Sequence, residues 1–325
     1  MLEPRAYWVS VGMKFPFKLS ENKRYDVVGF GTNAVDFLIQ VPEYPKFNSK
    51  IELEDYVQAP GGEVATTMVG LQRLGLKTSY VGRFGDDPAG DLGLSSLADA
   101  GVDLTFAERI AGARTQIAFI VIDERNGERT VIWKRDAKLR YSATEAPVEA
   151  ATKARIVHMT PHDTAACIEM ANAGRSNGAI VSLDIDRAFD GIENLLPLVD
   201  ILVASSDLPA ALTGISDPGR SLESLRETYG CSIVGVTLGE NGSLALGPNG
   251  LVESPGFPVP GGCKDTTGAG DSFRVGLLYG VLKGHSLDES CRLANAVAAL
   301  KCRAVGARTS LPDERELIEF VGVRS

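Results

Sequence analysis

The residues best suited to chemistry lie in one short stretch, Asp265 to Phe273, which reads DTTGAGDSF. Two glycines and an acid stand directly before apolar residues at helical spacing, and this spacing predicts a helix. The start of a helix offers unpaired backbone N–H groups and a partial positive charge, and glycine lets a ligand approach them closely. Gly268, Ala269 and Gly270 therefore form a predicted anion site, best suited to phosphate.

Asp271 is the candidate catalytic residue of this site. Its carboxylate can take a proton from an attacking hydroxyl while the neighbouring amides hold the charge of a transferred phosphoryl group. The simpler alternative is a plain helix with Asp271 as its N-cap, and a short glycine motif alone favours that alternative. Arg274 is expected on roughly the same side of the helix, where it can pair with Asp271 or a phosphate, or reach solvent.

The longer sequence favours the catalytic interpretation. The string from Asp265 through Asp271, with Phe273 and Gly276, closely resembles the C-terminal signature of the PfkB/ribokinase family of carbohydrate kinases. A second block resembles the N-terminal signature of that family: Gly61, Gly62, Thr67, Gly82, Gly85, Asp86, Asp87 and Gly90. The resemblance covers about residues 25–320. It implies ATP-dependent phosphorylation of a sugar hydroxyl, with a ribose- or fructose-like acceptor.

Polar residues after the first apolar segment, residues 25–31, are candidate contacts to the acceptor. Asn33 and Asp36 follow that segment, and in open α/β sheets ligands bind at the carboxyl ends of strands. Ordinary turn chemistry explains these two residues equally well. The resemblance places the backbone of Gly61 and Gly62 against the sugar. Thr66 stands where the family usually has Asn, and a hydroxyl lacks the two-ended reach of an amide, so the identity of the sugar stays open.

The resemblance also assigns residues to the nucleotide. A glycine turn after a predicted strand resembles the nucleotide-binding turn of the family, and in relatives the last long helix and the turn after it border the adenine. The candidates are Thr237, Gly239, Gly242, Asn295 and Gly306. ATP is therefore the expected phosphoryl donor.

Two kinds of cation follow from the resemblance. Mg²⁺ is expected with ATP, although Ser205 and Leu208 replace the Asn-x-x-Glu motif of many members, as in some ketohexokinase-type relatives. A nucleotide's own phosphates carry most of the ligation, and Mg²⁺ tolerates sites with few protein ligands. Some relatives bind K⁺ through carbonyl groups before the anion site and in the turn after the last long helix. Asp265 and Thr267 match the first group, which implies a monovalent-cation site.

The elements that must position these residues alternate between short apolar runs and helical stretches. Predicted strands are residues 154–159, 179–185, 201–204 and 233–238. Strands that alternate with helices are typical of parallel β-α-β units. The expected fold class is α/β, a ribokinase-like, doubly wound, mainly parallel sheet flanked by helices. We expect one kinase domain at 25–325 after an N-terminal extension at 1–24 whose first dozen residues are loose.

Two further segments, about 37–59 and 115–135, alternate apolar and polar residues and predict a small β-sheet lid over the main domain. Such a sheet has one apolar face and little to bury it against, which predicts a homodimer through the lid. Lys134 or Arg135 could neutralise phosphate charge from a lid strand, although a solvated strand end is the favoured explanation.

Composition limits the remaining classes. Among the 325 residues, 44% are hydrophobic and 23% charged, which is ordinary for a globular protein. A net charge of −9 disfavours nucleic acid and acidic membrane surfaces as partners, and no apolar run is long enough to span a membrane. Five cysteines without C-x-x-C spacing are typical of reduced thiols, which predicts a cytoplasmic protein.

Two alternatives remain open. A nucleoside kinase would use the same scaffold with an apolar base pocket in the lid, for which the candidates are Phe37, Phe119, Ile132 and Trp133. A non-catalytic sugar or nucleotide binder of the same fold is the alternative from another class. The changed motif positions favour such a binder, whereas the intact anion turn and Asp271 count against it, because binding alone needs no base.

Overall fold

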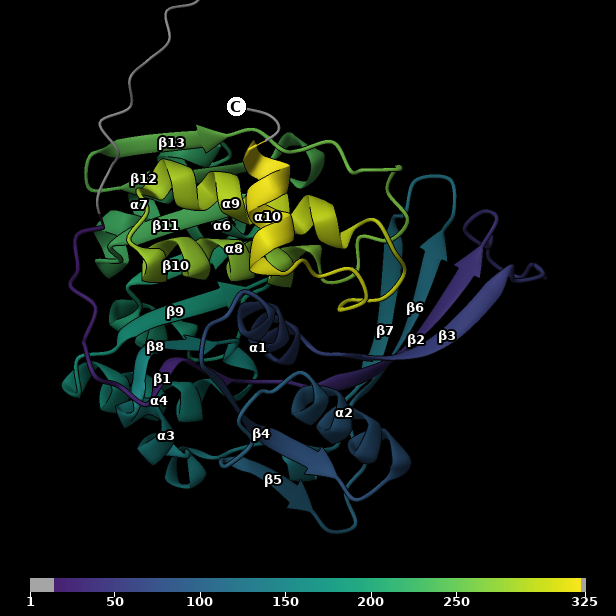
Figure 1. Ribbon diagram of the computed structural model, residues 1–325, viewed down its shortest axis with the longest axis horizontal. Coiled ribbons are helices and arrows are strands. Elements are labelled where there is room, and N and C mark those ends of the chain that lie inside the picture. The colour runs from purple at the N-terminus through teal and green to yellow at the C-terminus, as the bar shows by residue number, and fades with distance from the viewer. Residues whose placement is uncertain (1–14, 323–325) are drawn as a thin grey trace, which may run out of the picture.

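The computed structural model describes residues 15–322, which form two separate sheets (Figure 1). The larger sheet has the strand order β13 (Gly250–Ser254), β12 (Ser243–Gly247), β11 (Ile233–Thr237), β10 (Ile201–Ala204), β9 (Ile180–Ile185), β8 (Ala154–Met159), β1 (Tyr25–Phe30), β4 (Thr78–Gly85) and β5 (Ala107–Ile110). Only the pairs β11–β12 and β12–β13 are antiparallel among these strands. The expected α/β class with a mainly parallel sheet is confirmed.

Helices cover both faces of this sheet (Figure 1). The helices are α1 (Glu63–Arg73), α2 (Pro88–Asp99), α3 (Val148–Thr152), α4 (Thr164–Ser176), α5 (Ile192–Leu195), α6 (Leu208–Thr213), α7 (Pro218–Tyr229), α8 (Ala269–Lys283), α9 (Leu287–Lys301) and α10 (Glu314–Gly322). Successive strand side chains point to opposite faces, so Val27 packs in the core with α1, α8 and α9, whereas Val28 packs with α3, α4 and α7. Two apolar cores therefore hold the sheet between two helical layers.

The smaller sheet is the lid that the alternating segments predict. Its strand order is β3 (Asp55–Gly61), β2 (Ala34–Val41), β6 (Ile117–Asp123) and β7 (Arg129–Lys134), and it stands to one side of the larger sheet (Figure 1). The lid is confirmed, with shifted boundaries. Its first two strands extend beyond the predicted range of about 37–59, because the β2–β3 ladder begins with Ala34 paired to Gly61. The ladder ends where Gln40 pairs with Asp55, so β3 begins at Asp55.

Two features of the larger sheet differ from the sequence-based prediction. Strands β12 and β13 form a hairpin that lies outside the ranges of the predicted strands. Strand β12 reads SLALG and β5 has four residues, AERI, so neither shows the long alternation that marks a strand.

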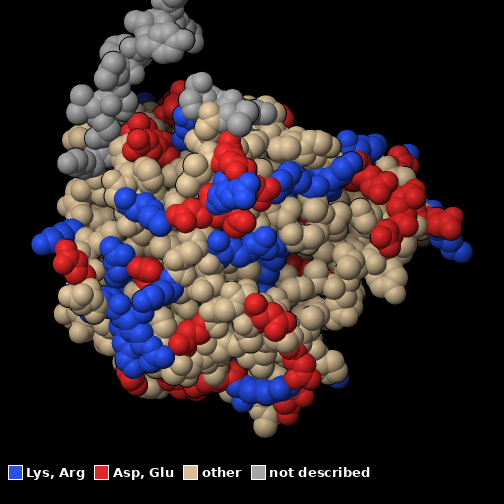
Figure 2. All heavy atoms as spheres, in the orientation of Figure 1, with Lys and Arg blue, Asp and Glu red and all other residues tan. Residues whose placement is uncertain are grey.

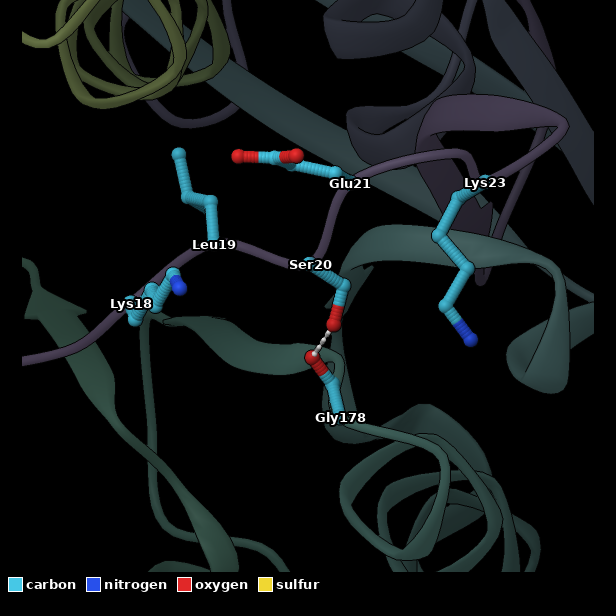
Figure 3. A pocket seen from close by; sticks show the side chains of 6 residues that line it. All are labelled: Lys18, Leu19, Ser20, Glu21, Lys23 and Gly178. Atoms are coloured by element: carbon cyan, nitrogen blue, oxygen red, sulfur yellow. Dashed lines mark hydrogen bonds between the residues drawn. The ribbon is translucent and has the colours of Figure 1, made fainter.

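The part of the N-terminal extension that the structure describes lies against the main domain. Phe15 and Phe17 pack on the core, and Lys23 Nζ donates hydrogen bonds to the carbonyl oxygens of Thr152 (2.9 Å) and Asn177 (2.7 Å). Ser20 Oγ donates to the Gly178 carbonyl at 2.5 Å beside a shallow hollow of about 410 Å³ (Figure 3). The dozen residues expected to be loose lie outside the described range. No helix between residues 15 and 322 is long and apolar enough to cross a membrane.

Candidate active site

A cleft of about 1520 Å³ opens between the lid and the ends of the body's strands. Its walls come from lid strands β2, β6 and β7, from the ends of β9, β10 and β11, and from the start of α8. The structure thus brings most of the predicted nucleotide and catalytic residues to one place. Those lining the cleft are Asp36, Gly62, Thr237, Gly239, Gly242, Thr267, Gly268, Ala269, Gly270, Asp271 and Asn295.

The predicted anion turn has the geometry of a helix start. Gly268 is the N-cap of α8, and its φ of 76° lies in the left-handed region that favours glycine. The Ala269 amide donates to the Thr266 carbonyl at 3.0 Å and the Ser272 amide to Gly268 at 2.9 Å. The amides of Gly270 and Asp271 form no backbone hydrogen bond outside the helix within residues 15–322, and both residues line the cleft. These two donors are therefore available to an anion.

Asp271 stands in the first turn of α8, at the wall of the cleft. Burial raises the pKa of its carboxyl well above the ordinary value, and the negative charges of Asp184 and Glu63 raise it further. A carboxylate with a raised pKa is a stronger proton acceptor than an ordinary one. The site therefore combines open backbone donors with a base directly beside them.

Arg274 has a definite partner in the structure, and that partner is Asp184 rather than Asp271. Its side chain is buried, and its Nη2 lies 2.5 Å from Asp184 Oδ1. The guanidinium also donates to the carbonyl oxygens of Val203 (3.1 Å) and Gly270 (3.0 Å). Arg274 thereby ties the start of α8 to the ends of β9 and β10. Burial raises the pKa of Asp184 to about 6, against the opposing effect of Arg274.

Sequence reasoning missed an acidic group on the floor of the cleft. Glu63, the first residue of α1, accepts a hydrogen bond from Thr32 Oγ at 3.3 Å, and its carboxylate lies 2.9 Å from His162 Nε2. Burial raises the pKa of Glu63, but the hydrogen bond and charge of His162, together with hydrogen bonds from Thr32 and Thr160, more than offset this and leave the pKa below its ordinary value. No motif marks this pair, because its members are 99 residues apart in the chain.

An aromatic wall stands next to Glu63, and of its residues sequence reasoning named only Trp133. The His162 ring packs edge-on against Phe189 (5.2 Å between ring centres) and Trp133 (6.0 Å). The Arg187 guanidinium lies over both partner rings, 4.8 Å from the centre of Phe189 and 5.3 Å from that of Trp133. All four residues line the cleft, so it has a wall to which a planar ring or a sugar face can bind.

The predicted base pocket in the lid is wrong for three of its four residues. Adjacent residues of a strand point to opposite faces, so Trp133 lines the cleft whereas Ile132 points away from it. Phe37 and Phe119 stack on each other (5.0 Å between ring centres) on the same outer face as Ile132, with which Phe119 is paired in register.

Under the lid, Asp36 is buried beside a charged residue that the sequence did not single out, Arg308. Burial raises the pKa of Asp36 to about 6, and the positive charge of Arg308 partly opposes this rise. The buried Arg308 side chain donates to Thr66 Oγ (3.3 Å), to Ser96 Oγ (3.1 Å) and to the Gly61 carbonyl. In the sequence, Arg308 is marked only by its place directly after the glycine turn around Gly306, which the family resemblance assigns to the site.

Several predicted contact residues lie behind the cleft wall rather than on it. Asn33, Gly61, Thr66 and Gly306 are not among the residues that line the cleft. Asn33 Nδ2 donates to Tyr80 Oη (2.9 Å) and to the Arg83 carbonyl (3.0 Å). Its amide therefore joins the segment after β1 to strand β4.

Another part of the cleft wall holds Thr237, Gly239 and Gly242 at the end of β11 and the turn after it. Asn295 is also there, but its Nδ2 donates to Ser254 Oγ and to the Ser254 carbonyl, both at 3.0 Å. The amide of Asn295 therefore anchors α9 to the β12–β13 hairpin.

The residues available for cations differ for the two expected ions. Within residues 15–322 no group of three or more His, Cys, Asp or Glu side chains is placed to hold a metal ion. Leu208 is buried, and Ser205 Oγ donates to the Asp186 carbonyl at 3.0 Å. A Mg²⁺ ion here would therefore be held mainly by nucleotide phosphates. The residues at the expected K⁺ site do not fit a K⁺ ion. The ammonium of Lys301 is already there, with its Nζ 2.7 Å from the Asp265 carbonyl oxygen.

Of the two cationic side chains predicted on the lid, neither lines the cleft. Arg135 forms a buried ion pair with Asp163 at 2.7 Å, which gives it a structural role. Arg129, at the start of β7, lines the cleft instead and donates to Thr266 Oγ at 2.9 Å, directly before the anion turn.

The fold and the site together define a phosphotransferase, with open helix-start amides and a carboxyl group of raised pKa at the strand ends of an α/β sheet. Residues 25–314 match the pfkB family of carbohydrate kinases, and the chain belongs to this family. The chain is 27% identical to a nucleoside kinase of Methanothermobacter thermautotrophicus over 93% of its length and 96% of the relative. It is 30% identical to fructokinase-1 of Zea mays over 91% and 97% of the two chains. The structure of Arabidopsis thaliana ribokinase complexed with ribose and ATP has the same fold, with a TM-score of 0.78, 24% identity, and coverage of 91% and 98%.

Proposed function

We propose that this kinase transfers the γ-phosphoryl group of ATP to a hydroxyl of a ribose- or fructose-like sugar. The observation that carries the proposal is Asp271, a carboxyl with a raised pKa beside the open amides of Gly270 and Asp271. Asp271 takes the proton of the acceptor hydroxyl, and the amides from Gly268 to Asp271 hold the charge on the transferred group. Catalysis rests mostly on positioning and charge stabilisation, as in phosphoryl transfer generally.

The two substrates enter the cleft from opposite ends in this proposal. The sugar lies under the lid, where Asp36 accepts hydrogen bonds from its hydroxyls and the backbone of Gly62 forms the floor. ATP lies over the turn of Gly239 and Gly242, with its phosphates directed toward the start of α8. Bound Mg²⁺ would supply charge neutralisation on the nucleotide phosphates.

A coupled ADP-release assay with Mg·ATP and a panel of pentoses, ketohexoses and nucleosides tests the proposal. One sugar should give turnover, and Asp271→Asn should reduce it by about 100-fold or more while the variant still binds both ligands. Asp190→Asn, an exposed acid outside the cleft, is the matched control and should keep full turnover. Ligand binding without turnover across the whole panel would support the non-catalytic binder instead.

A nucleoside acceptor is the second candidate, and the aromatic wall of Trp133, His162 and Phe189 favours it. The same panel decides between them, because a nucleoside that is turned over with a higher kcat/KM than any sugar would replace the sugar in the proposal.

A homodimer through the lid is part of the proposal. The outer face of the lid exposes Tyr56, Phe119 and Ile132, with exposed fractions of 65%, 43% and 60%. Figure 2 shows acidic side chains gathered at the right of the molecule, where Figure 1 places the lid's tip. Sedimentation that shows only monomer at micromolar concentration would remove the dimer. The five free cysteines support a cytoplasmic location.

A further inference from the structure

Lys301, the last residue of α9, is a buried cation next to the anion turn. Its Nζ donates a hydrogen bond to the Asp265 carbonyl oxygen at 2.7 Å and lies 3.6 Å from Asp265 Oδ2. Both side chains have an exposed fraction of 0%. A fully buried lysine is rare and needs a charged or polar partner, and here both partners belong to a single residue.

Asp265 in turn joins the two segments that shape the anion turn. Its Oδ1 accepts a hydrogen bond from the Thr267 amide at 2.7 Å, and its Oδ2 accepts one from the Gly306 amide at 2.8 Å. Gly268 packs directly on the second segment, since a Cβ placed on Gly268 would lie 2.9 Å from Ala307 Cβ. The position of the anion turn therefore depends on a carboxylate whose charge Lys301 neutralises.

The same two segments are those to which the family resemblance assigns a monovalent cation. In this chain the ammonium of Lys301 already donates a hydrogen bond to the Asp265 carbonyl oxygen and balances the charge of the Asp265 carboxylate. Arg129 adds a second positive charge nearby, since it donates to Thr266 Oγ and lowers the pKa of Lys301 beyond the effect of burial. A K⁺ ion placed there would compete with the Lys301 ammonium for the Asp265 oxygens. It would also be repelled by the positive charges of both Lys301 and Arg129.

We propose that Lys301 is a built-in cation that replaces the bound monovalent cation, so that phosphoryl transfer by this enzyme is independent of K⁺. Lys301 is a positioning residue, because it acts on the anion turn through Asp265. The kinetic part of this inference rests on the proposed kinase activity. The structural part, which concerns how Asp265 is neutralised, does not.

The first test compares the native enzyme in KCl, NaCl and tetramethylammonium chloride at equal ionic strength. Turnover and melting temperature should agree within experimental error in the three salts, because the cation is already in place. Activation by K⁺ of several-fold over tetramethylammonium would overturn the proposal.

The second test removes the ammonium with Lys301→Ala. The variant should lose about tenfold or more in kcat, and K⁺ or NH₄⁺ should restore part of kcat and raise its melting temperature, because Asp265 then needs a counter-ion. Lys153→Ala is the control, since this lysine pairs with Glu149 on the surface and should show no such salt response. A soluble Lys301→Ala enzyme with no selective response to K⁺ or NH₄⁺ would show that the lysine is merely structural.

Two features keep the tests decisive. Should Lys301→Ala fail to fold, the native salt comparison still stands alone, and Lys301→Met offers a variant that fills the same space. Should no acceptor be phosphorylated in any salt, the proposed function fails, while the cation-dependent melting of the variant still decides whether Lys301 replaces a bound ion.

Discussion

The guanidinium of Arg274 lies 2.5 Å from the Asp184 carboxylate, and both groups are buried where α8 meets the strand ends. A buried pair of this kind contributes little net stability, but removal of one partner leaves an uncompensated charge. The pair also fixes the first turn of α8, since Arg274 holds the Gly270 carbonyl.

Arg274→Leu should therefore destabilise the protein by about 3–5 kcal/mol in urea unfolding, because Asp184 would be buried without its partner. Addition of Asp184→Asn should recover part of that loss, since it removes the orphaned charge. Arg315→Leu, which breaks an exposed pair with Glu319, should cost less than about 1 kcal/mol. Equal losses for the single and the double variant would contradict this account.

Asp36 predicts a dependence of stability on pH. Its pKa is about 6 in the folded protein against an ordinary 3.8, so the native state holds this proton more tightly than the unfolded chain. Its contribution to stability is then present at low pH and is lost as the pH rises from 3.8 to about 6. In Asp36→Asn this decline should be smaller by up to about 3 kcal/mol, measured by urea unfolding across that range. Asp55→Asn, an exposed acid on the lid, should follow the native curve.

Cys263 should be the most reactive thiol of the chain. A hydrogen bond with the Cys302 thiol lowers the pKa of Cys263 to about 7, whereas burial raises the pKa of Cys167, Cys231 and Cys291. Alkylation by iodoacetamide should modify this residue first, with a rate that rises through a midpoint near pH 7, and Cys263→Ser should abolish the fast phase. Because Cys263 lines the cleft, ATP should slow the reaction. A fast phase that survives in Cys263→Ser would assign it to another thiol.

Two neighbours on β7 should separate catalysis from association. Trp133 faces the cleft, so Trp133→Ala should raise the acceptor KM about tenfold or more with little change in sedimentation. Ile132 faces outward, so Ile132→Asp should weaken the dimer and leave the acceptor KM within about twofold. An exchange of these two outcomes would mean that the lid's faces are reversed in the working enzyme.

The sequence predicted those parts of the molecule that local patterns determine. The apolar runs at β8 and β10 match their predicted bounds, and the glycine pattern before α8 marks a helix start in the structure. Period-two alternation also contained the information that Trp133 and Ile132 point to opposite faces, although the sequence-based prediction grouped them together. Local patterns therefore predict elements and the faces of strands.

Contacts between distant segments could not be predicted in this way. Arg308 donates to Thr66 Oγ across 242 residues, and His162 meets Glu63 across 99. Each of these side chains also suits a solvated surface, because no local spacing distinguishes a buried arginine from an exposed one. Only the packing of distant segments shows that Arg308 is buried against Gly61, Thr66 and Ser96.

The long reach of Arg308 has a consequence for how the protein is made. Its contact with the Gly61 carbonyl joins residues 247 positions apart, so the buried surroundings of Asp36 stay incomplete until residue 308 has left the ribosome. A nascent chain that already carries Asp271 would still lack the arginine that holds the Gly61 carbonyl. A truncation just before Arg308 would therefore leave the anion turn in a chain whose Asp36 has lost its positive neighbour.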